Sequence, residues 1–319
     1  MTISVKKGIF SSLAIIAFLL WLVSIWWGLP PSAYDVKANA QTTAKINNHK
    51  IVAGYTTTTT LIDVTSWLIE KPGGFISNDV TPPGLFMDNM PAFEYGALEQ
   101  IRDLALAMRL DFSRSPSQST GDKDLEKAQE KINTSHKNWA LPGAEKEYRQ
   151  AIASLLHYRA RLVEKSKSDA QFYPRADNLN AWLGALEKRL GSLSQRLSLS
   201  SYNTALAGSQ QSSETAGQQT PWFQIDDVFY ESRGATWAIV HFLKAVEVDF
   251  SEVLKKKNAQ VKLKQIIKEL ELTQAALWSP VILNGSGFGL LANHSLVMAD
   301  YVSHAKVALI DLRRLLEQG

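Results

Sequence analysis

Apolar residues recur along most of the chain at intervals of three and four, the spacing that places side chains on one face of an α-helix. The most regular series is a run of leucines at Leu179, Leu183, Leu186, Leu190, Leu193 and Leu197. Similar series run from Tyr148 to Leu162, from Ile225 to Val253 and from Leu291 to Leu315. These four segments are predicted to be the long helices of the soluble part.

Shorter helices are predicted at about 48–70, 94–112, 123–137 and 260–278. The only β-prone run is Thr56–Thr60, and it lies inside an apolar helical pattern. Apolar seams of this kind pack helices side by side at shallow angles. The sequence therefore predicts an all-α protein, a long-helix bundle that follows a single N-terminal transmembrane helix.

The expected transmembrane anchor is the uncharged segment 8–29, which has 22 residues. A helix of that length spans about 33 Å, enough to cross the hydrocarbon core of a bilayer. Lys6 and Lys7 precede it, which favours a cytoplasmic N-terminus (residues 1–7) and translocation of the rest of the chain. Trp26 and Trp27 stand at its far end, where indole rings favour the membrane interface.

A cleaved signal peptide is the alternative, because Ala38-Asn39-Ala40 offers an A-x-A cleavage site. The apolar segment is longer than the core of a typical signal peptide, and the site lies well beyond its end. The uncleaved anchor is therefore the favoured interpretation.

Beyond the anchor, the polar, low-complexity segment 207–220 is expected to be a flexible linker. It divides a helical domain into an N-terminal half, 41–206, and a C-terminal half, 221–319. Two other irregular segments, 71–93 and 278–290, are rich in Gly, Pro, Asn and aromatic residues. Loops of that composition adopt specified conformations and often carry function.

Composition narrows the classes of function. The net charge is only +3, with 34 basic and 31 acidic residues interspersed, so nothing indicates binding to nucleic acid. The chain has no cysteine, which excludes disulfides, thiolate zinc sites, iron–sulfur clusters and thiol catalysis. We expect no metal site and no cofactor.

Several segments carry a resemblance to known proteins: PGGFISNDVTPPG, DNMPAFE, RLGSLSQRLS, IDDVFYESRG, WSPVILNGSGFG and ANHSLVMA. With them the chain resembles a proteobacterial family of N-terminally membrane-anchored proteins of unknown function, over nearly its whole length. The resemblance implies a bacterial inner-membrane protein with a periplasmic domain. It implies no activity and no catalytic residues.

The candidate catalytic residues are Asp79, Asp88, Glu94 and His294. A pair of carboxylates in different environments can act as acid and base, as in glycoside hydrolysis. Loop aspartates more often build turns and cap helices, and acidic residues favour helix N-termini. His294 falls on the apolar seam of the last helix, and a hydrogen-bonded core histidine is the simpler interpretation.

The candidate ligand-binding residues are Asn89, Asn284, Gly285, Gly287 and Gly289. Amides before a helix can hold an anion, but no strand precedes this Gly-rich turn and no nucleotide-binding motif is present. A tight helix–helix turn is the simpler interpretation. We also expect the segments 71–94 and 284–294 to meet at one end of the bundle.

The favoured function is a membrane-anchored periplasmic module that binds another envelope protein or a lipid without catalysis. One alternative is a periplasmic hydrolase that acts on a glycan or lipid with the carboxylates of the 71–94 loop. Another is a bundle that binds a small ligand near His294.

Overall fold

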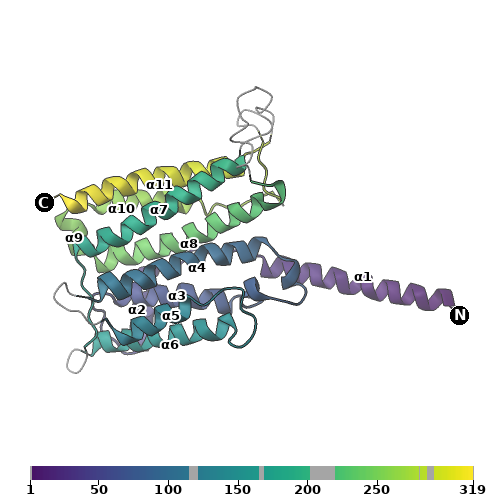
Figure 1. The fold of residues 1–319 in the computed structure, drawn as a ribbon, viewed down its shortest axis with the longest axis horizontal. Coiled ribbons are helices and arrows are strands. Elements are labelled where there is room, and N and C mark those ends of the chain that lie inside the picture. Colours follow the sequence, from purple (N-terminus) through teal and green to yellow (C-terminus); the bar gives the residue numbers. More distant parts are fainter. Residues whose placement is uncertain are drawn as a thin grey trace.

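The computed structural model describes residues 2–114, 121–164, 169–201, 220–279, 281–285 and 291–318. The fold is all-α, and its long helices run side by side along one axis (Figure 1). The described ranges contain no strand, and their one β-like feature is an isolated antiparallel bridge between Asn284 and Asn293. The predicted fold class is confirmed.

The helices are α1 (Thr2–Trp27), α2 (Val36–Ile46), α3 (Tyr55–Glu70), α4 (Asn89–Ala107), α5 (Lys123–Ile132), α6 (Ala144–Val163), α7 (Ala176–Ser201), α8 (Ile225–Asp249), α9 (Ser251–Lys256), α10 (Gln260–Leu272) and α11 (His294–Glu317). A π-helical turn, Met108–Phe112, continues α4. Short 3-10 turns are η1 (Ile76–Asn78), η2 (Gly84–Phe86) and η6 (Trp222–Gln224). Most of the expected linker, residues 207–219, lies outside the described residues.

Several predicted boundaries need correction. The helix expected at 48–70 begins only at Tyr55, because Gly54 has φ +85° and turns the chain sharply before it. The unpredicted α2 precedes it, so the expected domain start at residue 41 falls inside a helix. The series predicted from Ile225 to Val253 is split at Phe250, which lies between α8 and α9.

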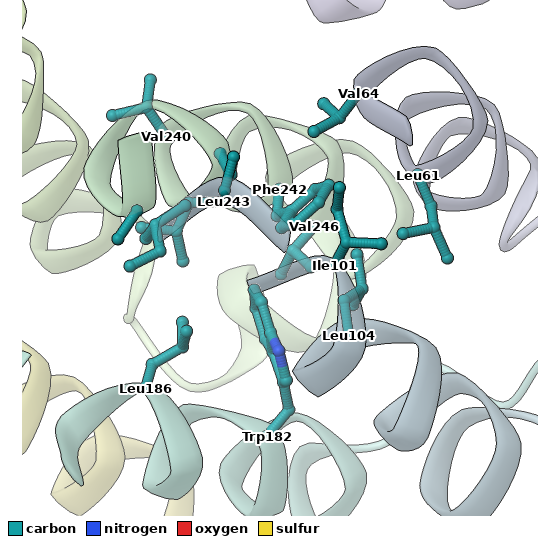
Figure 2. Close-up of a cluster of buried hydrophobic side chains, with 14 of the residues drawn as sticks. Leu61, Val64, Ile101, Leu104, Trp182, Leu186, Val240, Phe242, Leu243 and Val246 are labelled. Atoms are coloured by element: carbon teal, nitrogen blue, oxygen red, sulfur yellow. The ribbon is translucent and has the colours of Figure 1, made fainter. Parts of the chain in front are cut away.

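The apolar seams are buried as their spacing predicts. The leucines from Leu179 to Leu197 are at most 4% exposed. In the centre of the bundle, side chains of α3, α4, α7 and α8 meet around Trp182, Leu186 and Leu243 (Figure 2). The buried cluster takes members from both sides of the segment 207–220, so the two halves share one core.

The helices α4 and α8 pack closely because each places a glycine against the other. A Cβ atom on Gly96 would lie 1.9 Å from the carbonyl oxygen of Glu231. A Cβ atom on Gly234 would lie 1.9 Å from the carbonyl oxygen of Phe93. Only glycine permits so close a backbone approach, so these two residues determine the spacing of the central helix pair.

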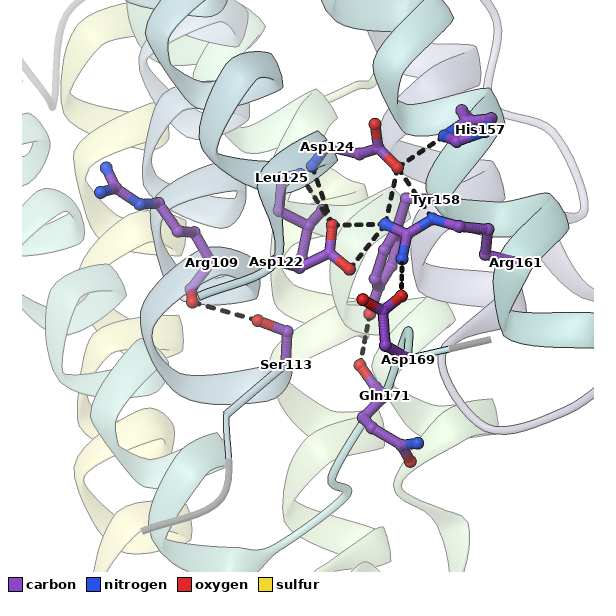
Figure 3. Close-up of polar contacts among 10 residues, drawn as sticks. All are labelled: Arg109, Ser113, Asp122, Asp124, Leu125, His157, Tyr158, Arg161, Asp169 and Gln171. Atoms are coloured by element: carbon purple, nitrogen blue, oxygen red, sulfur yellow. Dashed lines mark hydrogen bonds and ion pairs between the residues drawn. The ribbon is translucent and has the colours of Figure 1, made fainter. Parts of the chain in front are cut away.

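Charged groups tie the loops together at the end of the bundle away from α1 (Figure 3). The Arg161 guanidinium contacts Asp122 at 2.7 Å, Asp124 at 2.6 Å and Asp169 at 2.5 Å. His157 Nδ1 lies 2.6 Å from the same Asp124 oxygen. This end is therefore held by ion pairs at the surface.

The first helix projects from the opposite end of the bundle (Figure 1). Its segment Gly8–Trp27 has 20 residues with mean hydropathy 2.4 and is not buried against the rest of the protein. By length and composition this segment is able to cross a membrane, and a signal sequence has the same properties.

Candidate functional site

Four loops lie at the end of the bundle from which α1 projects: 71–88, 133–143, 220–224 and the described residues of 273–285 (Figure 1). Direct contacts join the first two loops to each other and the last two to the end of α7. Asn78 Nδ2 donates to the carbonyl of Asn138 at 2.9 Å, which links the first two loops. Trp27 packs on the first loop, since a Cβ atom on Gly73 would lie 2.5 Å from its ring. We call this end of the bundle the anchor end.

Glu94 is enclosed at this end and does not face solvent. Its carboxylate accepts hydrogen bonds from the backbone N–H groups of Ile76 and Ser77, at 2.9 and 2.8 Å, and from Ser77 Oγ at 2.6 Å. Lys71 Nζ lies 2.7 Å from Glu94 Oε1, and the two side chains are only 1% and 0% exposed. Burial raises the pKa of Glu94, and the Lys71 ammonium counteracts part of that rise. These contacts make Glu94 the acceptor that shapes the 71–79 segment.

Asp79 is half-buried against Gly84, where an added Cβ atom would lie 2.0 Å from Asp79 Oδ2. Its pKa is raised, first by burial and then by the neighbouring carboxylate of Glu145. Asp79 therefore has a carboxylate neighbour, but that neighbour lies on α6 and not in its own loop.

Asp88 is exposed and caps the start of α4, where its side chain accepts from the backbone N–H of Asn89 at 2.8 Å. Its charge contributes to the raised pKa values of Asp226 and Asp227, for which burial is the first cause. Asn89 Oδ1 is buried and has no hydrogen-bond partner among the described residues. No group of three or more His, Asp or Glu side chains in the described ranges is arranged to hold a metal ion.

His294 is the first residue of α11 and is half-buried. The ring Nδ1 of His294 accepts a hydrogen bond from the backbone N–H of Leu283 at 3.0 Å. The backbone N–H of His294 donates to the carbonyl of Leu283 at 2.8 Å. Burial lowers the pKa of His294, which favours the neutral ring that this acceptor role requires. The histidine thus fastens the preceding loop to the helix.

Asn284 lies in the same loop, and its side chain makes two hydrogen bonds to neighbouring helices. Its Nδ2 donates to the carbonyl of Ser200 at 2.9 Å, and its Oδ1 accepts from the N–H of Ser295 at 3.2 Å. The N–H of Gly285 donates to the carbonyl of Ala292. The candidates Gly287 and Gly289 lie outside the described residues.

The segment 71–94 and the described residues of the segment 284–294 (284–285 and 291–294) lie at the same end of the bundle, on either side of the first turns of α8 (Figure 1). Asp88 acts electrostatically on Asp226, and the His294 ring lies 6.4 Å from that of Phe229. No hydrogen bond joins the two segments within the part of the chain described, so α8 mediates between them.

Exposed aromatic side chains gather at the anchor end. Outside α1, the exposed Phe and Trp side chains of the described residues are Phe86 (79%), Trp139 (65%), Trp222 (87%), Phe223 (68%) and Trp278 (96%). We call these five the aromatic rim. All of them lie in the four anchor-end loops, alongside exposed aliphatic residues such as Leu85 and Leu141. Near the far end, the exposed apolar side chains are aliphatic ones such as Ile46 and Val261.

A cavity of about 450 Å³ lies where α1 meets the bundle. Trp26, at the end of α1, lines it together with Tyr34, Asp63, Trp67, Lys71 and Trp237. The centroids of the Trp67 and Trp237 rings are 5.0 Å apart, and Lys71 Nζ lies 6.0 Å from the Trp67 ring centre. This anchor-end cavity therefore has aromatic walls with charged groups among them.

Asp63 is the acidic group of the cavity. Asn39 Nδ2 donates to its Oδ2 at 2.6 Å, whereas Oδ1 has no hydrogen-bond partner among the described residues. Burial raises the pKa of Asp63 to about 6, and the neighbouring Arg159 reduces the rise. Arg159 Nη1 donates to Thr59 Oγ1 at 3.0 Å and not to this carboxylate.

Tyr34 and Trp237 bring two further polar groups to the cavity. His241 holds Tyr34 in place, because their rings stack at 4.5 Å and His241 Nε2 accepts from the N–H of Tyr34 at 3.4 Å. Tyr34 Oη and Trp237 Nε1 are both buried without a hydrogen-bond partner in the described ranges. Buried polar groups are normally paired. Of the nine buried side-chain atoms without a partner among the described residues, these two belong to residues that line the cavity.

This cavity was not predicted from the sequence. One signal was available, because Asp63 is the only charged residue between Lys50 and Glu70. A carboxylate among the mostly buried, uncharged side chains of a helix must be paired, neutral or functional. Its neighbours could not be found from spacing, because Tyr34 and His241 are 207 positions apart.

The chain is similar to a known protein family over nearly its entire length. A family model described as "Uncharacterized protein conserved in bacteria (DUF2333)" matches residues 2–319. Searches of curated proteins and of solved structures found no match.

Proposed function

The chain belongs to that bacterial family, and we propose that it is a membrane-anchored helical module whose anchor end lies on the membrane surface and binds lipid there without catalysing a reaction. On the charge pattern around α1, we further propose that the bundle is periplasmic and that the membrane is the bacterial inner membrane. Lys6 and Lys7 precede the span and favour a cytoplasmic N-terminus.

The aromatic rim carries this proposal. Trp side chains favour the interface between hydrocarbon and water, where the apolar ring is buried while the indole N–H stays hydrated. Phe side chains on the same surface can be buried at the boundary between headgroups and acyl chains. On a soluble surface, five exposed aromatic side chains at one end would be an aggregation hazard. They lie at the end from which α1 projects, and α1 continues the long axis of the bundle (Figure 1). A membrane that contains α1 would therefore meet the aromatic rim.

The packing after α1 favours an anchor that stays attached. Cleavage after Ala40 would cut α2 in its middle and remove its N-cap, Asp35, whose side chain accepts from the N–H of Ala38 at 3.0 Å. It would also remove the buried Val36 and the stacked Tyr34. Removal of these residues would take packed side chains and a helix cap away from the folded domain.

The hydrolase alternative has weaker support. Glu94 is enclosed and its oxygens accept several hydrogen bonds. Asp79 and Asp88 have different carboxylate neighbours, Glu145 and Asp226. A glycosidase needs two carboxyl groups that face one substrate.

Spin labels on the full chain test the proposal directly, because the natural chain has no cysteine. Phe86→Cys, Trp139→Cys, Trp222→Cys and Trp278→Cys would each carry one nitroxide in chain reconstituted into vesicles. Ile46→Cys and Val261→Cys, 78% and 77% exposed near the far end, are the matched controls. We expect the four rim labels to be relaxed by oxygen and shielded from a water-soluble nickel complex, and the controls to show the opposite.

Rim labels as accessible to nickel as the controls, in vesicles where α1 is inserted, would contradict a membrane-facing rim. If a protein partner covers the rim instead, the labels become immobilised only when native membranes replace pure lipid. That outcome would show that the rim binds an envelope protein and not lipid.

A further inference from the structure

The anchor-end cavity is the strongest unexplained feature of the molecule. It has a free carboxylate oxygen on Asp63 and two buried groups, Trp237 Nε1 and Tyr34 Oη, that lack a partner among the described residues. Trp237 is only 2% exposed and lines the cavity, so its N–H depends on the contents of the cavity for a partner. A volume of about 450 Å³ is large enough for a small organic group.

The distribution of donors and acceptors indicates the chemistry of a ligand. Asp63 Oδ1 can accept a hydrogen bond from a cation, and Trp67 and Tyr34 supply ring faces, to which cations are attracted. The indole N–H of Trp237 can only donate, so it requires an acceptor such as a phosphate or ester oxygen. The Tyr34 hydroxyl can donate to the same group. The cavity therefore complements a group that carries a cation and an oxyanion close together.

We propose that this cavity binds an aminoethyl phosphate group, with its primary ammonium beside Asp63 and its phosphate oxygens at Trp237 and Tyr34. A primary ammonium fits better than a methylated one, because it donates a hydrogen bond to Oδ1 in addition to contacting the aromatic rings. The same chemistry occurs in a phospholipid headgroup and in free phosphoethanolamine.

The position of the cavity favours the lipid source. Trp26, Leu29 and Pro30 line its outer part, and Trp26 and Leu29 are 57% and 60% exposed. These residues are the end of the membrane-spanning segment and the turn after it. A headgroup at the bilayer surface would thus lie beside the opening. This choice of source rests on the proposed function, whereas the ligand chemistry rests on the cavity alone.

The two positively charged side chains near Asp63, Lys71 and Arg159, do not pair with its carboxylate. Lys71 is neutralised by Glu94 at 2.7 Å and also donates to the carbonyl of Gly74 at 2.6 Å. Arg159 Nη1 donates to Thr59, one helical turn away from Asp63 on α3, and no hydrogen bond joins Arg159 to Asp63 among the described residues. The carboxylate of Asp63 therefore remains available to a ligand cation.

Titration of the full chain in detergent with short-chain lipids tests the proposal. The probes are dihexanoyl phosphatidylethanolamine, the phosphatidylglycerol with the same chains, and free phosphoethanolamine, with heats of binding measured in neutral buffer. We expect the amine lipid to bind at least about tenfold more tightly than the glycerol lipid. Comparable affinity for free phosphoethanolamine would assign a soluble source, and much weaker affinity would assign the lipid.

Variants locate the binding in the cavity. Asp63→Asn keeps the shape and the Asn39 contact but removes the charge, and it should weaken amine binding at least about tenfold. Tyr34→Phe removes only a hydroxyl and should weaken binding severalfold. Glu252→Gln, an exposed carboxylate on α9, should change nothing. Equal binding of both lipids by the wild type, or wild-type affinity in Asp63→Asn, would overturn the proposal.

These results are separable from those on the aromatic rim. If the spin labels show a membrane-facing rim but Asp63→Asn binds normally, only the cavity proposal fails. If the rim labels stay in water while the amine headgroup binds through Asp63, only the membrane-surface proposal fails.

Discussion

Lys71 Nζ lies 2.7 Å from Glu94 Oε1, and both side chains are enclosed where the loop after α3 meets the start of α4. A buried ion pair contributes little by itself, because desolvation of the two charges offsets their attraction. Loss of one partner is different, since it leaves an uncompensated charge in the interior. Here the charge would also lie beneath the segment 71–79, which is fixed by hydrogen bonds to Glu94.

Lys71→Met should therefore lower the free energy of unfolding by about 3–5 kcal/mol. Adding Glu94→Gln to this variant should recover part of the loss, because it removes the unpaired charge. Lys188→Met, at an exposed position on α7, should stay within about 0.5 kcal/mol of the wild type. Chemical denaturation of the three proteins checks this, and wild-type stability in Lys71→Met would mean that the pair is hydrated.

The close contact of α4 and α8 gives a second prediction. Gly96→Ala and Gly234→Ala each place a methyl group where a carbonyl oxygen would be 1.9 Å away, so the helices must separate. We expect each to lower stability by about 2 kcal/mol or more, as overpacked positions do. Gly121→Ala, which meets no atom within 4 Å, is the control. Thermal melts that rank the three variants equally would show that the helix pair has room to adjust.

The sequence predicted the fold because each long helix carries one apolar seam. Leu186 and Leu190 are buried because their spacing requires it, whichever helix covers them. The same pattern does not show which helices are neighbours. The contact of Gly96 with Glu231 joins positions 135 residues apart (231 − 96), and neither Gly96 nor Gly234 has a local signature that predicts such a contact.

The candidate site was predicted less well, because local chemistry was judged without burial. The sequence makes Glu94 a candidate acid or base, but its position inside the core gives it backbone donors and a buried lysine. The interpretation of His294 as a hydrogen-bonded residue agrees better with its contact to Leu283. No motif surrounds Asp63 that would mark it as part of a site, and Trp237 comes from a helix far away in the sequence.

His294→Ala should lower stability by about 1–2 kcal/mol, because the N–H of Leu283 loses its acceptor in a half-buried place. The binding of amine lipid should not change, since His294 is not among the residues that line the cavity. Denaturation and lipid titration of the same variant check both parts. Lost lipid binding with unchanged stability would instead make the histidine part of a binding site.

The pH dependence of stability should report Asp63. Burial raises the pKa of this carboxyl from 3.8 to about 6, so the folded protein binds its proton more tightly than the unfolded chain does. Its contribution to stability is complete below pH 3.8 and is lost as the pH rises through about 6. Burial also raises the pKa of Asp249, which accepts a hydrogen bond from Thr57 near the start of α3, to about 6. Its contribution to stability therefore changes with pH in the same direction.

Asp63→Asn should remove the part of the pH dependence of stability that Asp63 contributes. The part that Asp249 contributes should remain. Near neutral pH the variant should be more stable than the wild type, by up to about 3 kcal/mol, while the two should converge in acid. Tyr34 and Tyr55 also face this carboxyl, and burial raises the pKa of both tyrosines further from that range. The guanidinium of Arg159 acts on Asp63 as a fixed positive charge. Urea denaturation across the acid range measures the difference. A pH-independent difference would mean that Asp63 titrates normally.

The last prediction concerns Tyr34, where stability and function should change in opposite directions. Its hydroxyl is buried without a partner in the described ranges, and an unsatisfied polar group destabilises a fold by about 1–3 kcal/mol. Tyr34→Phe removes that group and keeps the ring stacked on His241, so the ligand-free protein should become more stable by about 1 kcal/mol. If the hydroxyl is there to bind a ligand, the same change should weaken the binding of amine lipid severalfold. A residue with a purely structural role would not give that combination. A variant that loses stability and binds lipid normally would show that the hydroxyl already has a partner, such as water, and that the cavity does not use it.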